Sequence, residues 1–255
     1  MRILMTGDVV GRPGRRAISK LIPALRSELG IDFVIANGEN IAAGLGLTPD
    51  TTQELYDAGV DVITTGNHAW AKKEIFSYLE SDMPLVRPLN YPPEIPGRGF
   101  CVHRDVMVVQ ICGRVFMTAV DDPFRAIDHL LESYADKPRI IIVDAHTEAT
   151  SEVGGLGWFL DGRVSAVLGT HTHVGTVDAK VLPQGTAFVS DIGMVGPRDS
   201  IIGNAVDGVL ERFSTALYVR LAVADGPISF NSVLMEIDDE TGRARRIERV
   251  DREVD

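Results

Sequence analysis

Two histidines lie one residue apart where an apolar run meets a glycine-bounded turn. The stretch VLGTHTHVG, residues 167–175, holds His171 and His173, and the whole chain of 255 residues has 6 histidines. Imidazole is the commonest metal ligand in proteins, and alternating positions can project two rings to one side of the chain. The pair therefore indicates a metal site, provided that other ligand-type residues occupy equivalent places along the chain.

Polar clusters also follow other short apolar runs. The runs 2–6, 32–37, 60–65, 139–144 and 164–169 are rich in Val and Ile, and we expect each to form a buried strand. In open α/β sheets the loops beyond the carboxyl ends of the strands converge, so polar residues at these ends meet in one site. The residues concerned are Asp8, Glu39, Asn40, Asn67, His68, His146, His171 and His173.

Without His68, this set offers three imidazoles, two carboxylates and two carboxamides. No cysteine takes part, which argues against a structural zinc knuckle. Mixed nitrogen and oxygen ligation suits Mn, Fe or catalytic Zn better than Ca or Mg, which prefer oxygen ligands. Seven side chains exceed what one ion needs if positions stay open for water and substrate. Two ions about 3.5–4 Å apart, bridged by one carboxylate, would use them all.

Each residue alone also has an ordinary structural interpretation. Asp8 after a glycine is typical of a turn or a cap, and Glu39 and Asn40 are typical of polar loop residues. A single His146 after a strand is more often a hydrogen-bonded core residue than a ligand. The joint pattern favours the metal site.

The elements that must position these residues alternate between strands and helices. One helix is expected to begin at Pro13, and another is capped by Thr48, begins at Pro49 and ends at Gly59. This alternation implies largely parallel strand pairing. Over 100–120 we expect adjacent strands around Gly113, and near the end antiparallel strands joined at Asp225-Gly226. Residues 88–98 are expected to form a long surface loop.

A mixed sheet, or two packed sheets flanked by helices, fits this pattern best, in a single domain over 1–255. The net charge of −11 argues against long nucleic acids and anionic membranes as partners. It does not exclude a small phosphate-bearing substrate, because bound cations reverse the local field. Cys101 and Cys112 are too few for a disulfide framework, and no apolar stretch is long enough to span a bilayer. We therefore expect a cytoplasmic protein.

The motifs GD, GEN, GNH, H and HTH, in this order, resemble those of the calcineurin-like metallophosphoesterases. They are most similar to the YmdB-type bacterial branch, the 2′,3′-cyclic-nucleotide 2′-phosphodiesterases. The likeness covers nearly the whole chain and includes GDVVGRPGR, ANGEN, TTGNHAW, HTEATSE, LDGRVSAVLGTHTHV and SDIGMVGPRDSIIG. Two places depart from the wider superfamily: Val10 stands where a histidine is common, and Glu39-Asn40 replaces the usual bridging aspartate element. Both departures agree with the branch.

The resemblance implies a four-layer α/β/β/α sandwich of mixed sheets with two metal ions. Iron or manganese is the expected metal, and zinc is possible. One ion would be held by Asp8, Glu39, Asn40 and His173, and the other by Glu39 as a bridge with Asn67, His146 and His171.

The implied activity is hydrolysis of small phosphodiesters such as 2′,3′-cyclic nucleotides, by a metal-bridging hydroxide. His68 would assist the leaving group, unless it only orients Asn67. Two other functions stay open: a phosphomonoesterase or nucleotidase, and a non-catalytic regulator that senses a nucleotide through bound metal. Arg12 is a candidate for a phosphate contact and residues 152–158 for a mobile edge of the site, with a solvent-facing arginine and a turn before a helix as the alternatives.

His103 and His129 match no motif, and we expect them to be structural or surface residues. The expected partner is a small phosphodiester, with no long nucleic acid and no membrane. A homo-oligomer is possible.

Overall fold

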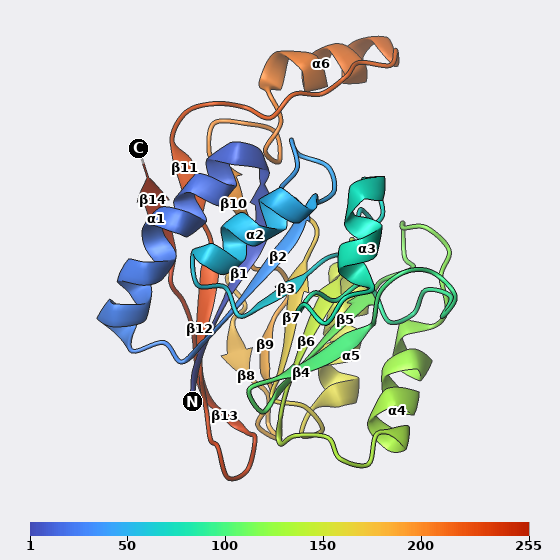
Figure 1. Cartoon of the computed structure of the whole chain (residues 1–255), viewed down its shortest axis with the longest axis vertical. Helices are drawn as coiled ribbons and strands as arrows, with labels where there is room; N and C mark the ends of the chain where they lie inside the picture. The colour runs from blue at the N-terminus through green and yellow to red at the C-terminus, as the bar shows by residue number, and fades with distance from the viewer. Residues whose placement is uncertain (255) are drawn as a thin grey trace.

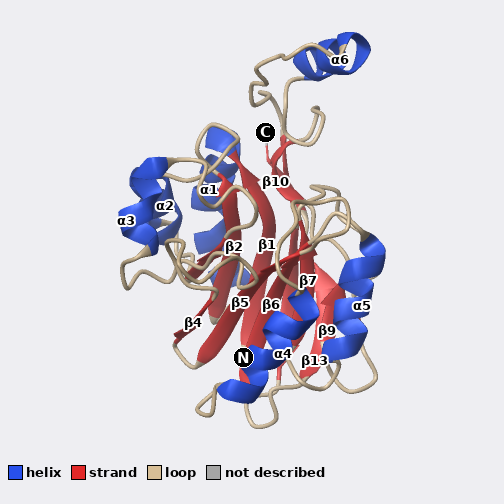
Figure 2. Cartoon of the chain, turned by 90° about the vertical axis from the view of Figure 1, so that its right-hand side faces the viewer, coloured by secondary structure: helices blue, strands red, loops and turns tan. Residues whose placement is uncertain are grey.

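Two β-sheets lie face to face in the structure, and helices cover the outer side of each sheet (Figures 1 and 2). The structure is a computed structural model that describes residues 1–254. Its layers run helix, sheet, sheet, helix, so the predicted four-layer α/β/β/α sandwich of mixed sheets is confirmed. None of the helices in residues 1–254 is long and apolar enough to cross a bilayer.

The first sheet has eight strands and is centred on β1, which pairs with parallel β2 and β10 and with antiparallel β12. Strand β3 extends the sheet beyond β2, β13 extends it beyond β12, and β11 and β14 extend it beyond β10. The strands are β1 Arg2–Val10, β2 Phe33–Asn40, β3 Val62–Thr64, β10 Met194–Pro197, β11 Ile228–Phe230, β12 Ser232–Ile237, β13 Ala244–Arg249 and β14 Arg252–Val254.

The second sheet has six strands in the order β4-β5-β6-β7-β9-β8. Its four central strands are parallel, and the edge strands β4 and β8 pair antiparallel with their neighbours. The strands are β4 Phe100–His103, β5 Val106–Cys112, β6 Ile140–His146, β7 Ala166–Thr170, β8 Lys180–Val181 and β9 Ala187–Val189.

Helices α1 to α3 cover the first sheet, α4 and α5 cover the second, and α6 stands away from both (Figure 1). The predicted helix start at Thr48-Pro49 is confirmed, since the Thr48 hydroxyl accepts a hydrogen bond from the Thr51 N–H. The helix predicted from Pro13 begins at Gly11. The helices are α1 Gly11–Leu29, α2 Pro49–Asp57, the 3₁₀ turn η1 Lys73–Ile75, α3 Phe76–Leu79, α4 Pro123–Ser133, α5 Thr150–Leu160 and α6 Val206–Thr215.

Three separate groups of buried apolar side chains hold the four layers together. Successive residues of a strand face opposite sides of a sheet, so Leu4 packs under the helices whereas Ile3 and Met5 face the second sheet. In β5, Val108 faces the first sheet and Met107 faces α4 and α5. Both faces of each sheet are thus covered, which explains why the strands are continuous apolar runs.

Three strands extend further than predicted and include residues expected to follow them. Asp8 lies within β1, Glu39 and Asn40 end β2, and His146 is the last residue of β6. Strand β1 continues because register shifts on both sides of Asp8 let it stay paired with β2. These four predicted ligands are therefore fixed by strand hydrogen bonds and not by loops.

The prediction that Gly113 lies at the turn between two strands is wrong. Strands β4 and β5 are joined at Arg104-Asp105, whose φ angles are 48° and 64°. The N–H of Gly113 donates to the carbonyl of His146 at 2.9 Å, at the point where β6 ends. The chain then leaves the sheet because no neighbouring strand remains to pair with it, and residues 114–120 form no strand.

The hairpin predicted at Asp225-Gly226 is also wrong. Residues 216–224 form no named strand, and β11 begins only after Pro227, which has no N–H to continue a sheet. Strand β11 pairs antiparallel with β10 and β14 instead. Antiparallel pairing near the end of the chain is confirmed, but it joins different strands from those expected.

Residues 152–158 lie inside α5, so the alternative of a turn before a helix is wrong. A mobile edge of the site at these residues stays a prediction. Residues 88–98 hold no named helix or strand, in agreement with the expected loop.

Glycines 154 and 157 in α5 allow a matched stability test. A Cβ at Gly154 would meet no atom within 4 Å, whereas a Cβ at Gly157 would lie 2.6 Å from the Phe188 ring. Because Gly costs helix stability relative to Ala, we expect Gly154→Ala to raise the free energy of unfolding by about 0.5–1 kcal/mol. Gly157→Ala should lower it. Urea titrations of both variants test this, and destabilisation by Gly154→Ala would contradict the packing described for α5.

Candidate metal centre

The predicted ligands meet where the carboxyl ends of strands from the two sheets lie together. Asp8 comes from β1, Glu39 and Asn40 come from β2, and His146 comes from β6. Glu39 Oε1 lies 3.2 Å from His146 Nε2, which links the first sheet to the second. The turns after β3 and β7 supply the remaining residues, Asn67, His68, His171 and His173.

One group of ligand atoms surrounds His146. Its Nε2 lies 3.0 Å from His171 Nδ1, 3.1 Å from Asn67 Oδ1 and 3.2 Å from Glu39 Oε1. One atom from each of Glu39, His146 and His171 lies within 4.8 Å of the other two. This separation allows all three to bind one cation.

A second group surrounds His173. Its Nε2 lies 3.7 Å from Asp8 Oδ1 and 3.3 Å from Asn40 Nδ2. Asn40 Nδ2 also contacts Glu39 Oε1 at 3.3 Å, so Glu39 touches both groups. The structure thus brings together all seven residues that the sequence predicted as ligands.

Each of the three histidines has one ring nitrogen bonded away from the cluster. His146 Nδ1 lies 2.9 Å from the Thr170 hydroxyl, and His173 Nδ1 lies 2.9 Å from the carbonyl of Ile202. His171 Nε2 lies 3.3 Å from Glu148 Oε2. Such outer partners fix the tautomer of a ligating histidine and direct its other nitrogen to the metal.

The sequence suggested that His171 and His173 alternate along an extended chain, but they do not. They follow the end of β7, and their φ angles are 104° and 64°. Positive φ is uncommon outside glycine and is strained, so other contacts must hold it. Asp8 Oδ2 accepts the His171 N–H at 3.0 Å, and Asp191 Oδ2 accepts the Thr172 N–H at 3.0 Å.

Three observations show that this cluster fits cations. First, Asp8 Oδ1 is buried and has no hydrogen-bond partner in residues 1–254. Second, the Thr170 hydroxyl donates to Asp144 and therefore accepts from His146 Nδ1, so His146 Nε2 faces the oxygens of Asn67 and Glu39. Burial lowers the pKa of His146, but the charges of Glu39, Asp8 and Asp144 outweigh it and raise this pKa to about 9, so a proton occupies the place that a bound cation would take. Acceptors that face one another need a proton or a cation between them.

The third observation is the space at Gly66. A Cβ at this position would lie 2.4 Å from both Glu39 Oε2 and His146 Nε2, so glycine keeps the cluster open. Asn40 presents its Nδ2 to His173 Nε2 and Glu39 Oε1 in the structure, so it would need a half-turn of its amide to offer Oδ1 to a cation there.

The electrostatics of the cluster follow from burial and close charges. Burial raises the pKa of Asp8. Burial also opposes ionisation of Glu39, but the charge of His146 and hydrogen bonds from His146 and His68 outweigh it and hold the Glu39 pKa well below its usual range. Burial and the charge of His146 lower the pKa of His171 to about 3. His171 therefore stays neutral at pH 7, the state that a metal ligand needs.

Sequence reasoning missed the residues that support the ligands. Thr170, Glu148 and Asp191 hold the histidines or their turn, and Asp144 accepts the Thr170 hydroxyl at 2.6 Å. Burial raises the pKa of Asp144 and that of Asp191 to about 7. Asp144 lies two residues before His146 in the cluster DAH, which was the only signal for its role.

The remaining residues that the sequence analysis named lie beside the cluster or outside it. His68 Nδ1 lies 2.8 Å from Asn40 Oδ1 and 3.2 Å from Glu39 Oε1. The predictions for His103 and His129 are confirmed, because the His103 ring packs beside Phe33 and His129 is exposed on α4. Arg12 is exposed at the start of α1. The two cysteines are buried, free thiols.

The model of one protein family, described as YmdB-like protein, matches residues 4–250. This chain belongs to the YmdB-like family. The resemblance of its motifs to the YmdB-type branch is therefore confirmed. A Bacillus subtilis (strain 168) protein named 2′,3′-cyclic-nucleotide 2′-phosphodiesterase is 45% identical over 98% of this chain and 96% of its own length.

Two solved structures share the fold of this chain. A hypothetical protein from Thermus thermophilus is 46% identical with a TM-score of 0.93, and the match covers 99% of both chains. A novel phosphatase from Mycoplasma pneumoniae is 30% identical with a TM-score of 0.93, over 99% of this chain and 93% of its own.

Two buried threonines near His146 provide a test of the outer partners. Thr170→Val removes the hydroxyl that orients His146, so we expect the affinity for a divalent cation to fall by about 10–100-fold. Thr147→Val is the matched control, because the Thr147 hydroxyl is buried without a hydrogen-bond partner in the described chain. Competition against a chelating dye measures both. Equal affinities for the two variants would show that Thr170 does not support the ligand.

Proposed function

We propose that this chain is a metal-dependent phosphodiesterase that hydrolyses small phosphodiesters such as 2′,3′-cyclic nucleotides. The observation that carries the proposal is the position of the Glu39 carboxylate. It is buried and contacts both His146 and Asn40, one member of each ligand group. The name of the Bacillus subtilis relative supports the substrate class.

The proposed centre binds two ions, with iron or manganese favoured and zinc possible, because the ligands are mixed nitrogen and oxygen atoms. When bound, the ions polarise the phosphate oxygens and lower the pKa of a coordinated water. One ion is assigned to Asp8, Glu39, Asn40 and His173, and the other to Glu39, Asn67, His146 and His171.

His68 is proposed to give a proton to the leaving oxygen. Its Nδ1 is occupied by Asn40 and Glu39, so Nε2 is the ring nitrogen available to a substrate. The side chain is 34% exposed and lines a cavity beside the cluster. The leaving oxygen of a cyclic nucleotide belongs to the sugar, so the sugar is expected on the His68 side of the cluster.

A phosphomonoesterase is the second candidate, favoured by the description of the Mycoplasma pneumoniae structure as a phosphatase. The same ligand set could bind a terminal phosphate. Self-association and a cytoplasmic location also stay predictions.

A substrate comparison separates the two candidates. We expect metal-loaded protein to convert 2′,3′-cyclic AMP into the 3′-monophosphate and to hydrolyse 2′- and 3′-AMP far more slowly. Release of inorganic phosphate distinguishes the reactions. Faster hydrolysis of the monophosphates would favour the phosphomonoesterase, and bound cyclic nucleotide without turnover would favour the sensing regulator.

Replacement of His68 tests the acid role. His68→Gln keeps a polar side chain but removes the transferable proton, so we expect kcat to fall by about 10²–10⁴-fold with the metal content unchanged. His103→Gln is the control, because His103 lies outside the cluster. Full turnover by His68→Gln with its metals bound would rule out proton donation by this residue.

A further inference from the structure

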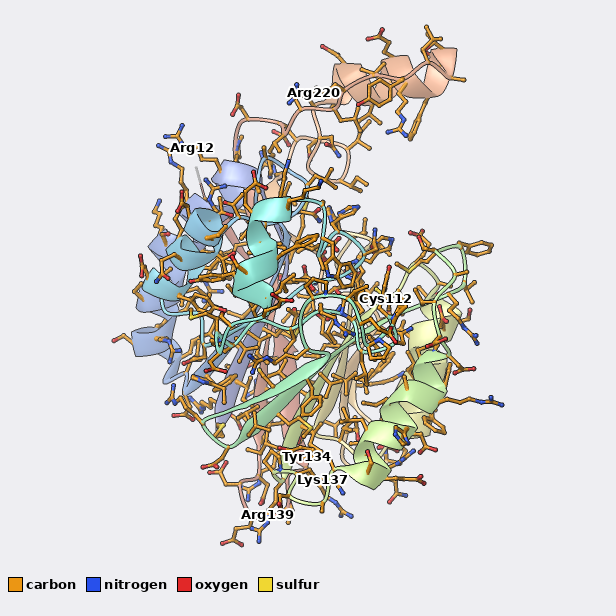
Figure 3. The ribbon with its side chains drawn as sticks, turned by 45° about the vertical axis from the view of Figure 1, so that its right-hand side comes forward. Arg12, Cys112, Tyr134, Lys137, Arg139 and Arg220 are labelled. Atoms are coloured by element: carbon orange, nitrogen blue, oxygen red, sulfur yellow. The ribbon has the colours of Figure 1, made fainter. Side chains whose placement is uncertain are left out.

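A cavity of about 870 Å³ begins at His68, and none of the seven predicted metal ligands lines it. Its walls come from the start of α1, the loop 43–45, Lys72 and the segment 218–225 that returns from α6. Figure 3 shows Arg12 and Arg220 at the end of the molecule from which α6 projects. The cavity thus borders the candidate metal centre on the side of the proposed proton donor.

The lining of the cavity is positively charged, although the chain as a whole is negative. Arg12, Lys72, Arg212 and Arg220 line it, with Asp225 as the one carboxylate among its lining residues. The net charge of the whole chain is −11. Within residues 1–254, Arg12, Lys72 and Arg220 form no ion pair, whereas nearby Arg15 pairs with Glu54 at 2.6 Å. Unpaired cations around a cavity favour an anionic ligand.

The position of His68 indicates which part of a substrate enters the cavity. If His68 serves the leaving sugar oxygen, the sugar lies between the candidate metal centre and the cavity. A group on the 5′ oxygen of that sugar then extends away from the ligand cluster, toward the cationic walls of the cavity. This step rests on the proposed function.

We propose that the cavity binds a phosphate on the 5′ oxygen of the nucleotide whose cyclic phosphate is hydrolysed. That phosphate is either a 5′-terminal monoester or the link to a preceding nucleotide in a short RNA, since both place an anion at the same oxygen. Arginine and lysine bind such a phosphate through charge-assisted hydrogen bonds. The preferred substrates are therefore 5′-phosphorylated or short oligonucleotide ends, and not free cyclic mononucleotides.

Three substrates test the proposal with the metal-loaded wild-type protein: adenosine 2′,3′-cyclic phosphate, its 5′-phosphorylated form, and the dinucleotide ApA with a 2′,3′-cyclic end. We expect kcat/KM to be about tenfold higher for one or both of the latter two, mainly through KM. A gain for only one of them identifies whether the monoester or the link is bound. Equal kcat/KM for all three overturns the proposal.

Replacing the cationic residues that line the cavity tests whether they cause the preference for a 5′-phosphorylated substrate. Arg12→Ala and Lys72→Ala should reduce the ratio of kcat/KM between 5′-phosphorylated and unphosphorylated substrate toward one. Arg16→Ala and Lys73→Ala are matched controls, because these exposed neighbours do not line the cavity and should keep the ratio. A ratio that Arg12→Ala and Lys72→Ala leave unchanged overturns the assignment of the cavity.

A binding measurement separates this inference from the proposed function. Calorimetry compares adenosine 3′,5′-bisphosphate with adenosine 3′-monophosphate, and we expect the bisphosphate to bind about tenfold more tightly to wild type but not to Arg12→Ala or Lys72→Ala. If no substrate is hydrolysed, the proposed function fails, and this binding preference still decides the inference. Equal binding of the two nucleotides by wild type overturns it.

Discussion

The convergence of acceptor atoms from two sheets on one buried place is the constraint on which the rest of the structure depends. Asp8 and Glu39 are almost fully buried, and a histidine nitrogen lies close to each of them. The Asn67 oxygen faces the same His146 nitrogen as Glu39 does. Burial of unpaired carboxylates costs several kcal/mol, so the arrangement requires positive charge between them. Protons on histidine supply part of this charge, and bound cations would supply it more completely.

The fold explains how residues from position 8 to position 173 reach this place. Parallel strands deliver their carboxyl ends to one edge of each sheet, and the packing of apolar side chains between the sheets brings the two edges together. Local features of the backbone then bring the ligand atoms to their final positions. Register shifts around Asp8 extend β1, glycine at position 66 leaves space, and positive φ at His171 and His173 turns the chain across the cluster.

Much of this could be predicted from the sequence. The apolar runs located the five strands that matter, because strands buried on both faces are continuous Val- and Ile-rich stretches. Residue type and placement after these runs identified all seven side chains that the structure brings together. Sequence patterns could not show that Asp8 and His146 lie within strands, since strand ends depend on which neighbour is still available for pairing.

Other features depend on contacts between distant parts of the chain. Thr170, Glu148 and Asp191 acquire their roles only when the turns are in place, and threonine or aspartate near a strand end is common in any α/β protein. The dipeptide Asp225-Gly226 is typical of a hairpin, but Pro227 and the projecting α6 leave it without a partner strand. The cationic cavity joins residues far apart in sequence. Arg12 lies in the motif GDVVGRPGR and was a candidate phosphate contact, but Lys72, Arg212 and Arg220 belong to no motif.

The most direct test of the central claim is to count and locate metal ions in protein purified without a chelator. Elemental analysis with anomalous diffraction at the iron and manganese edges gives both quantities. The account predicts two ions in each chain, one beside Asp8 and His173 and one beside His146 and His171, with Glu39 touching both. Active protein that holds no metal at this edge of the sheets would contradict it.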